Sequence, residues 1–93
     1  MLRITNGPAV DHRVTLQLEG RVAGPWVGEL RRLCEPVLGK GHSLFLDLAN
    51  VTFLDEEGVR LLQTLRAQGC QIVGASPFVI EQLKAPRVIS PDA

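Results

Sequence analysis

Residues 43–69 constrain the fold of this chain more than any other segment. Leucines occupy every second position from Leu44 to Leu48, and this period of two predicts a strand with one buried face. A short polar turn follows the strand. Residues 56 to about 68 then carry apolar side chains at helical spacing, which predicts an amphipathic helix that ends at Gly69. A strand followed directly by a helix indicates an α/β fold.

The remaining elements are expected on both sides of this segment. Further strands are predicted at residues 2–5, 13–19 and 71–74 from their apolar alternation or short apolar runs. Helices are predicted to begin at Pro25 and Pro77, because a first helical residue has no use for its N–H. Trp26 is expected in the core, and Pro36 is expected to end or bend its helix near the last turn. A last strand at residues 87–89 is also considered.

This order of elements predicts one arrangement of layers. Strand–helix–strand connections of this length favour parallel neighbours and right-handed crossovers, which place successive helices on the same face of a sheet. The strands are apolar on one side only, so one face is left uncovered. We therefore expect a single mixed β-sheet of four or five strands with helices packed on one face. The side chains expected in the core include Leu16, Leu18, Leu46, Leu48, Leu62 and Leu65, and those expected on the uncovered face are Thr15, Gln17 and Asp47.

Size and composition limit the classes of function. The chain has 93 residues and no net charge, which predicts one domain, with a core at about 2–84 and a short tail at 85–93, and gives no reason to expect nucleic acid as a partner. No segment has the apolar run of a signal peptide or of a membrane span, so membrane insertion is not expected. Cys34 and Cys70 are expected to be buried thiols in a reducing cytoplasm. His12 and His42 are expected to be solvated, and no metal or other cofactor is predicted.

Three consecutive carboxylates, Asp55, Glu56 and Glu57, stand where the polar turn becomes the helix. A helix N-terminus carries about half a positive charge and unpaired N–H groups, so carboxylates there are favoured and Asp55 can cap the helix. Gly58 follows at once. A glycine inside a helix costs about 1 kcal/mol relative to alanine, so it is expected to allow close approach of another backbone or of a partner.

The residues around this turn resemble the signature of the STAS domain, the fold of bacterial anti-sigma factor antagonists. The matching residues are Asp47, Leu48, Phe53, Leu54, Asp55, Glu56, Glu57 and Gly58. The resemblance implies a surface that docks a kinase or a neighbouring subunit, centred on the loop expected at residues 50–54 and on the first helical turn. The residues expected to bind a partner are Asn50, Thr52, Asp55, Glu56, Glu57, Gly58 and Val59.

The sequence departs from the family at the phosphorylation site. Switchable members carry a serine after the aspartate, and a partner kinase phosphorylates it; this chain has Glu56 there, and Glu57 replaces the second serine. Glu56 either imitates phosphoserine permanently, with fewer charges and oxygens than a phosphate, or marks a site that has lost its switch. Thr52 is a nearby hydroxyl and a second candidate for phosphorylation, but an ordinary loop threonine is the favoured interpretation.

The resemblance therefore implies a non-enzymatic, cytoplasmic interaction module of bacterial signal transduction and transcription regulation. The expected partner is a histidine-kinase-like serine kinase that acts as an anti-sigma factor, with no phosphorylation at position 56. One alternative is a small regulatory subunit of a membrane transporter, such as a lipid-transport ATPase. Another is a small enzyme that uses the carboxylates, which is disfavoured because no second polar cluster is visible. A homodimer is also considered.

Overall fold

The computed structural model describes residues 2–7 and 10–84. The predicted order of elements is confirmed over these residues, and the strand considered at residues 87–89 lies outside them. The elements are β1 (Leu2–Asn6), β2 (Arg13–Val22), α1 (Pro25–Gly39), β3 (Ser43–Leu54), α2 (Glu56–Ala67), β4 (Gln71–Val73) and α3 (Pro77–Lys84).

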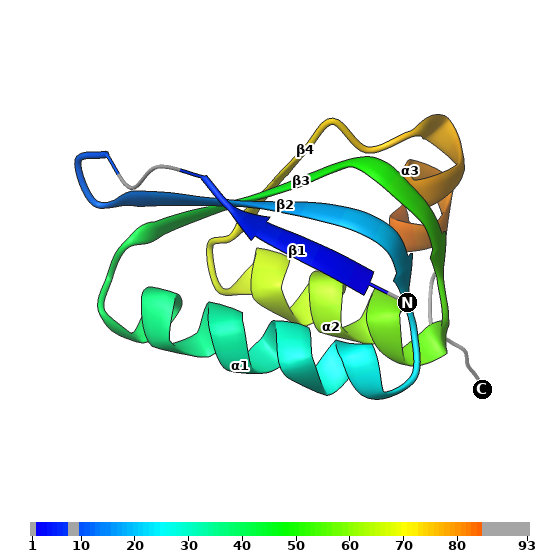
Figure 1. Cartoon of the computed structure of the whole chain (residues 1–93), viewed down its shortest axis with the longest axis horizontal. Helices are drawn as coiled ribbons and strands as arrows, with labels where there is room; N and C mark the ends of the chain where they lie inside the picture. Colours follow the sequence, from blue (N-terminus) through cyan, green and yellow to red (C-terminus); the bar gives the residue numbers. More distant parts are fainter. Residues whose placement is uncertain (1, 8–9, 85–93) are drawn as a thin grey trace.

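The four strands form one mixed sheet in the order β1-β2-β3-β4. β1 is antiparallel to β2, whereas β2, β3 and β4 are parallel. Helices α1 and α2 lie side by side below one face of the sheet (Figure 1). α3 packs against β3 and α2, where the Gln82 amide donates to the Leu54 carbonyl at 3.0 Å. The predicted fold class, a single mixed sheet with packed helices, is confirmed.

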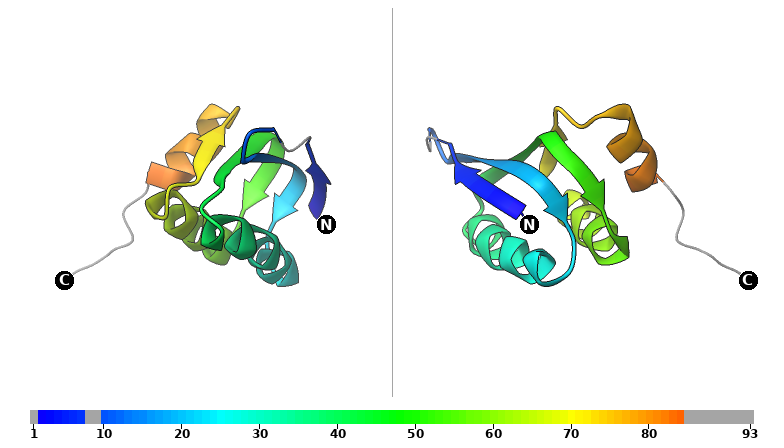
Figure 2. Two further views of the ribbon diagram at one scale, coloured as in Figure 1. Left: turned by 90° about the vertical axis from the view of Figure 1, so that its left-hand side faces the viewer. Right: turned by 45° about the vertical axis from the view of Figure 1, so that its right-hand side comes forward.

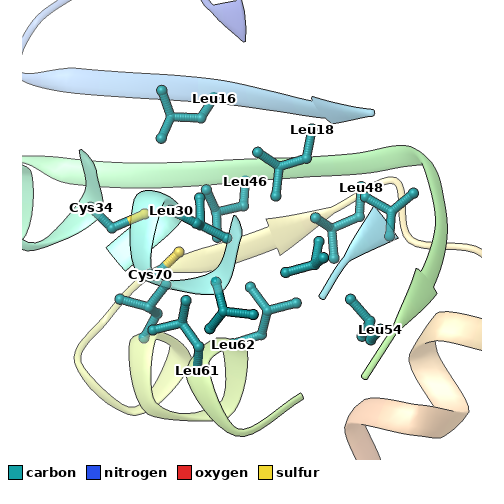
Figure 3. Close-up of a cluster of buried hydrophobic side chains, with 14 of the residues drawn as sticks. Leu16, Leu18, Leu30, Cys34, Leu46, Leu48, Leu54, Leu61, Leu62 and Cys70 are labelled. Atoms are coloured by element: carbon teal, nitrogen blue, oxygen red, sulfur yellow. The ribbon is translucent and has the colours of Figure 1, made fainter. Parts of the chain in front are cut away.

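The core lies between the sheet and the helices (Figure 3). All six leucines predicted to be buried are at most 2% exposed. Burying a leucine stabilises a fold by about 1.5–3 kcal/mol, so this layer contributes much of the stability. On the opposite face, Gln17 is exposed and Thr15 and Asp47 are half-buried, in line with the predicted alternation.

β3 is longer than predicted, because it continues through residues 50–54, where a loop was expected. Its register against β2 shifts between Gln17 and Glu19 and again between Gly20 and Arg21, which are β-bulges that insert extra residues into β3. The Asp47 carboxylate supports the first bulge by accepting the Ala49 N–H at 3.0 Å. Bulges bend a strand, and β3 curves down toward α2 in Figure 1.

The expected burial of Trp26 is wrong. α1 turns Val27, Leu30 and Cys34 toward the sheet, which leaves Trp26 on the flank of the helix with 37% of its surface exposed. Leu33, seven residues further along, lies on the same flank and is 44% exposed. Pro36 lies inside α1, and the helix ends three residues later, at Gly39, in line with the expectation that Pro36 stands near its last turn.

Candidate functional site

Asp55 joins three elements at the start of α2. As predicted, Asp55 caps this helix: its Oδ1 accepts the Gly58 N–H at 2.7 Å. Its Oδ2 accepts the N–H of Gly24, the residue before α1, at 2.9 Å. Its own N–H donates to the carbonyl of Val22, the last residue of β2, at 3.2 Å. The end of β2 and the starts of α1 and α2 are therefore held together by one side chain and its backbone.

Gly58 is a glycine because of packing within the chain. The residue is buried, and an added Cβ would clash with the carbonyl oxygen of Val22. Of the two reasons expected for this glycine, close approach of another backbone applies within the chain, so a bulky residue here would disturb the fold itself and not only a partner. Val59 is also buried. Gly58 and Val59 are therefore both buried at the start of α2 and offer little surface.

Glu56 and Glu57 project from the first turn of α2 into solvent. Their side chains are 78% and 62% exposed. The guanidinium of Arg60 lies 2.8 Å from the Glu57 carboxylate and 3.6 Å from that of Glu56. Exposed pairs of this kind contribute only about 0–1 kcal/mol to stability, so the pairs can open without unfolding the helix.

Arg60 is a site residue that the sequence reasoning missed. Its position three and four residues after the two glutamates is the spacing at which helical side chains meet, and this signal was available. With Arg60 in place, the three carboxylates of the site are accompanied by one positive charge. The first turn of α2 is therefore acidic, but less so than its sequence of three acids indicates.

Asn50 and Thr52 lie on the bulged end of β3, and both are exposed. The Thr52 hydroxyl donates to the Gly20 carbonyl at 3.3 Å, a long bond that leaves it accessible. Beside it, the guanidinium carbon of Arg21 lies 5.1 Å from the centre of the Phe53 ring. We use the term β3–α2 surface for the exposed residues Asn50, Thr52, Glu56, Glu57 and Arg60.

The other candidate residues form no site of this kind. The rings of His12 and His42 have centroids 5.3 Å apart, His12 being exposed and His42 half-buried. Among the residues that the structure describes, no group of three or more histidine, cysteine or acidic side chains is placed to hold a metal ion. No helix in the same ranges is long and apolar enough to cross a membrane.

Cys34 and Cys70 are free and buried, as predicted. Burial raises the pKa of the Cys34 thiol to about 12, with smaller contributions from Cys70 and Glu35, and burial raises the pKa of Cys70 to about 11. Both side chains lie at one end of the core (Figure 3). A thiol with a raised pKa holds almost no thiolate at neutral pH, so neither cysteine is suited to act as a nucleophile.

Comparison with known proteins bears on the fold. No family model matches the chain, and neither does any curated protein sequence. Among solved structures, the anti-sigma factor antagonist SpoIIAA in its unphosphorylated form matches with a TM-score of 0.72, over 85% of this chain and 79% of that one. The chain has a STAS-like fold. The sequence identity is 16%, so the likeness is one of architecture. The STAS resemblance drawn from the residues around the start of α2 is confirmed at that level.

Proposed function

We propose that this chain is a non-enzymatic STAS-like interaction module that binds a protein partner through the β3–α2 surface. Its partner is a histidine-kinase-like serine kinase that acts as an anti-sigma factor, and position 56 is not a phosphorylation switch. Two observations support the proposal: the structural likeness to an anti-sigma factor antagonist, and the exposure of Glu56 and Glu57 at the turn that carries the family resemblance.

A third observation carries the proposal: Asp55 holds this turn in place. Its carboxylate and N–H fix the backbone at the start of α2 to Gly24 and Val22. The side chains of Glu56 and Glu57 therefore project from a backbone that is held in place, and their carboxylates lie in solvent. A preorganised surface loses little conformational entropy on binding, which favours affinity for a partner.

The charges of the β3–α2 surface indicate what a partner must supply. Two exposed carboxylates require basic or hydrogen-bond donor groups, and Arg60 is a competitor for the same carboxylates. A partner arginine that displaces Arg60 exchanges one ion pair for another, and the new pair adds affinity only where its attraction exceeds the cost of removing both charges from water. Added salt is expected to weaken the complex, because it shortens the distance over which exposed charges attract each other, which is about 8 Å at physiological ionic strength.

Titration calorimetry of Glu57→Arg against a histidine-kinase-like serine kinase from the same organism tests the proposal. Reversing this charge is expected to weaken binding about tenfold or more, which corresponds to about 1.4 kcal/mol. Glu29→Arg is the matched control: Glu29 also pairs with an arginine three residues later, Arg32, at 2.9 Å, but it lies on α1. Circular dichroism establishes that both variants fold. Equal affinity of the two variants and the wild type would refute the proposed surface.

A further inference from the structure

The sheet has two open edges that differ in their protection. β4 has three residues, and short edge strands offer little to pair with. β1 has five residues, Leu2–Asn6, without proline or lysine, and its register against β2 has no bulge. Proline, lysine and bulges are the usual devices that keep an edge from pairing with another chain. In the part of the chain that the structure describes, β2 is the only strand beside β1.

The direction of the backbone groups of β1 follows from one hydrogen bond. The Gly7 N–H donates to the Thr15 carbonyl at 2.7 Å, directly beyond the last registered pair of β1 and β2. Facing residues of antiparallel strands alternate between hydrogen-bonded and non-bonded pairs. The backbone N–H and C=O groups of Thr5 and Arg3, two and four residues before Gly7, therefore form hydrogen bonds with β2.

The alternate residues Leu2, Ile4 and Asn6 direct their N–H and C=O groups away from β2. The open edge thus presents three donors and three acceptors, centred on Ile4. A twofold axis that passes beside Ile4, perpendicular to the sheet, places the β1 edge of a second copy antiparallel to this one. Ile4 of each copy then faces Ile4 of the other, and Leu2 faces Asn6. All six donors and six acceptors of the two edges are matched by this one register.

The position of the one charged residue of β1 agrees with that register. Arg3 is the single charged residue of β1, and its guanidinium lies 3.8 Å from Glu19 on the neighbouring strand. In the twofold register Arg3 faces Thr5 of the other copy, so no like charges are directly opposed. A register centred on Arg3 would oppose the two arginines and leave the outward N–H and C=O of Asn6 in each copy unmatched.

An apolar flank lies below this edge. Nine residues, about two and a half helical turns, separate Trp26 from Glu35, so the two project from opposite sides of α1. Glu35 lines a depression together with Gln68, the residue that follows α2, and therefore faces α2. Trp26 and Leu33 are on the other flank, and α1 is the helix on the β1 side of the molecule (Figure 2).

We propose that the β1 edge binds a second copy of this chain, forming a symmetric dimer with one continuous sheet. The two β1 strands pair in antiparallel register about Ile4, and the flanks with Trp26 and Leu33 approach each other below the joined sheets. A second copy is the occupant that matches the hydrogen bonds, the charges and the apolar flank with one symmetry operation. The residues involved are distinct from the β3–α2 surface, so the dimer does not depend on the function proposed above.

Light scattering coupled to size exclusion tests the dimer on the full chain at about 10–500 μM, which covers micromolar dissociation constants. The wild type is expected to show twice the mass of one 93-residue chain. Ile4→Pro removes an outward N–H without removing a bond to β2, and it is expected to give single chains. Ile4→Val keeps that N–H and is expected to remain dimeric.

A second pair of variants does not depend on the strand. Leu33→Arg places a charge on the α1 flank and is expected to abolish the dimer. Val73→Arg is the matched control, because Val73 is 41% exposed, similar to Leu33 at 44%, but lies on the β4 edge. Three results would overturn the proposal: a wild type of single-chain mass, a dimer that survives Leu33→Arg, or a dimer that Val73→Arg destroys equally.

Discussion

The carboxylate of Asp55 offers a measurable test of how the site is held. Asp55→Ala removes the 2.7 Å bond from the Gly58 N–H and the 2.9 Å bond from the Gly24 N–H. Loss of a helix cap costs about 0.5–2 kcal/mol. Loss of a hydrogen bond to a charged group costs about 1.5–3 kcal/mol. Gly24 is exposed, so its freed N–H can bond to water and the low end applies to it. We expect a loss of about 2–3 kcal/mol in the free energy of unfolding.

Urea unfolding followed by circular dichroism measures this loss, provided that the slope of the free energy against urea is unchanged. Asp55→Asn keeps one acceptor oxygen, but its NH₂ group cannot accept, so an intermediate loss is expected. Glu56→Ala, on the next residue, is the control, because it removes only an exposed ion pair and should cost less than about 1 kcal/mol. If Asp55→Ala costs no more than Glu56→Ala, the proposed clamp does not hold the site.

Three further predictions concern Gly58, position 56 and the two cysteines. Gly58→Ala gains about 1 kcal/mol of helix propensity but meets the Val22 carbonyl, so it is expected to lower the urea midpoint; a raised midpoint would contradict the packing. Incubation with ATP and the serine kinase should leave the intact mass of the wild type unchanged, whereas Glu56→Ser should gain one phosphate; phosphate on Thr52 of the wild type would show that the site is not silent. Because folding raises the pKa values of Cys34 and Cys70 above 9.0, the unfolded chain loses these protons at lower pH than the folded chain does. The free energy of unfolding should therefore fall above about pH 9, by up to about 1.4 kcal/mol per pH unit for each thiol. The free energy of a double Cys34→Ala, Cys70→Ala variant should fall less steeply with pH, and identical pH profiles would exclude this linkage.

Local periodicity accounts for the parts of the fold that were predicted. The alternating leucines of β2 and β3 identify the buried face, because each strand places every second side chain on the same side. The capping role of Asp55 was also predictable, because its bond to Gly58 spans three residues. The period of two stops at Ala49, where a bulge begins, so the sequence pattern could not show that β3 continues to Leu54.

Contacts between distant segments account for what was missed. The second hydrogen bond of the Asp55 carboxylate comes from Gly24, 31 residues away in the chain, and no local sequence pattern predicts it. The same is true of Gly58 in α2, where a larger side chain is excluded by the carbonyl of Val22 on β2. The exposure of Trp26 depends on the rotation of α1 about its axis, which packing against the sheet decides.

The bonds of Asp55 also determine how the native molecule can open. A fluctuation that frays the first turn of α2 releases the Gly58 amide and weakens the hold on the Gly24 amide before α1. The two helix starts therefore behave as one cooperative unit, and their amides are expected to exchange with deuterium at similar rates. A protein that binds Glu56 and Glu57 would slow deuterium exchange at the Gly24 amide as well. This amide lies outside the contact surface, so its exchange rate reports binding.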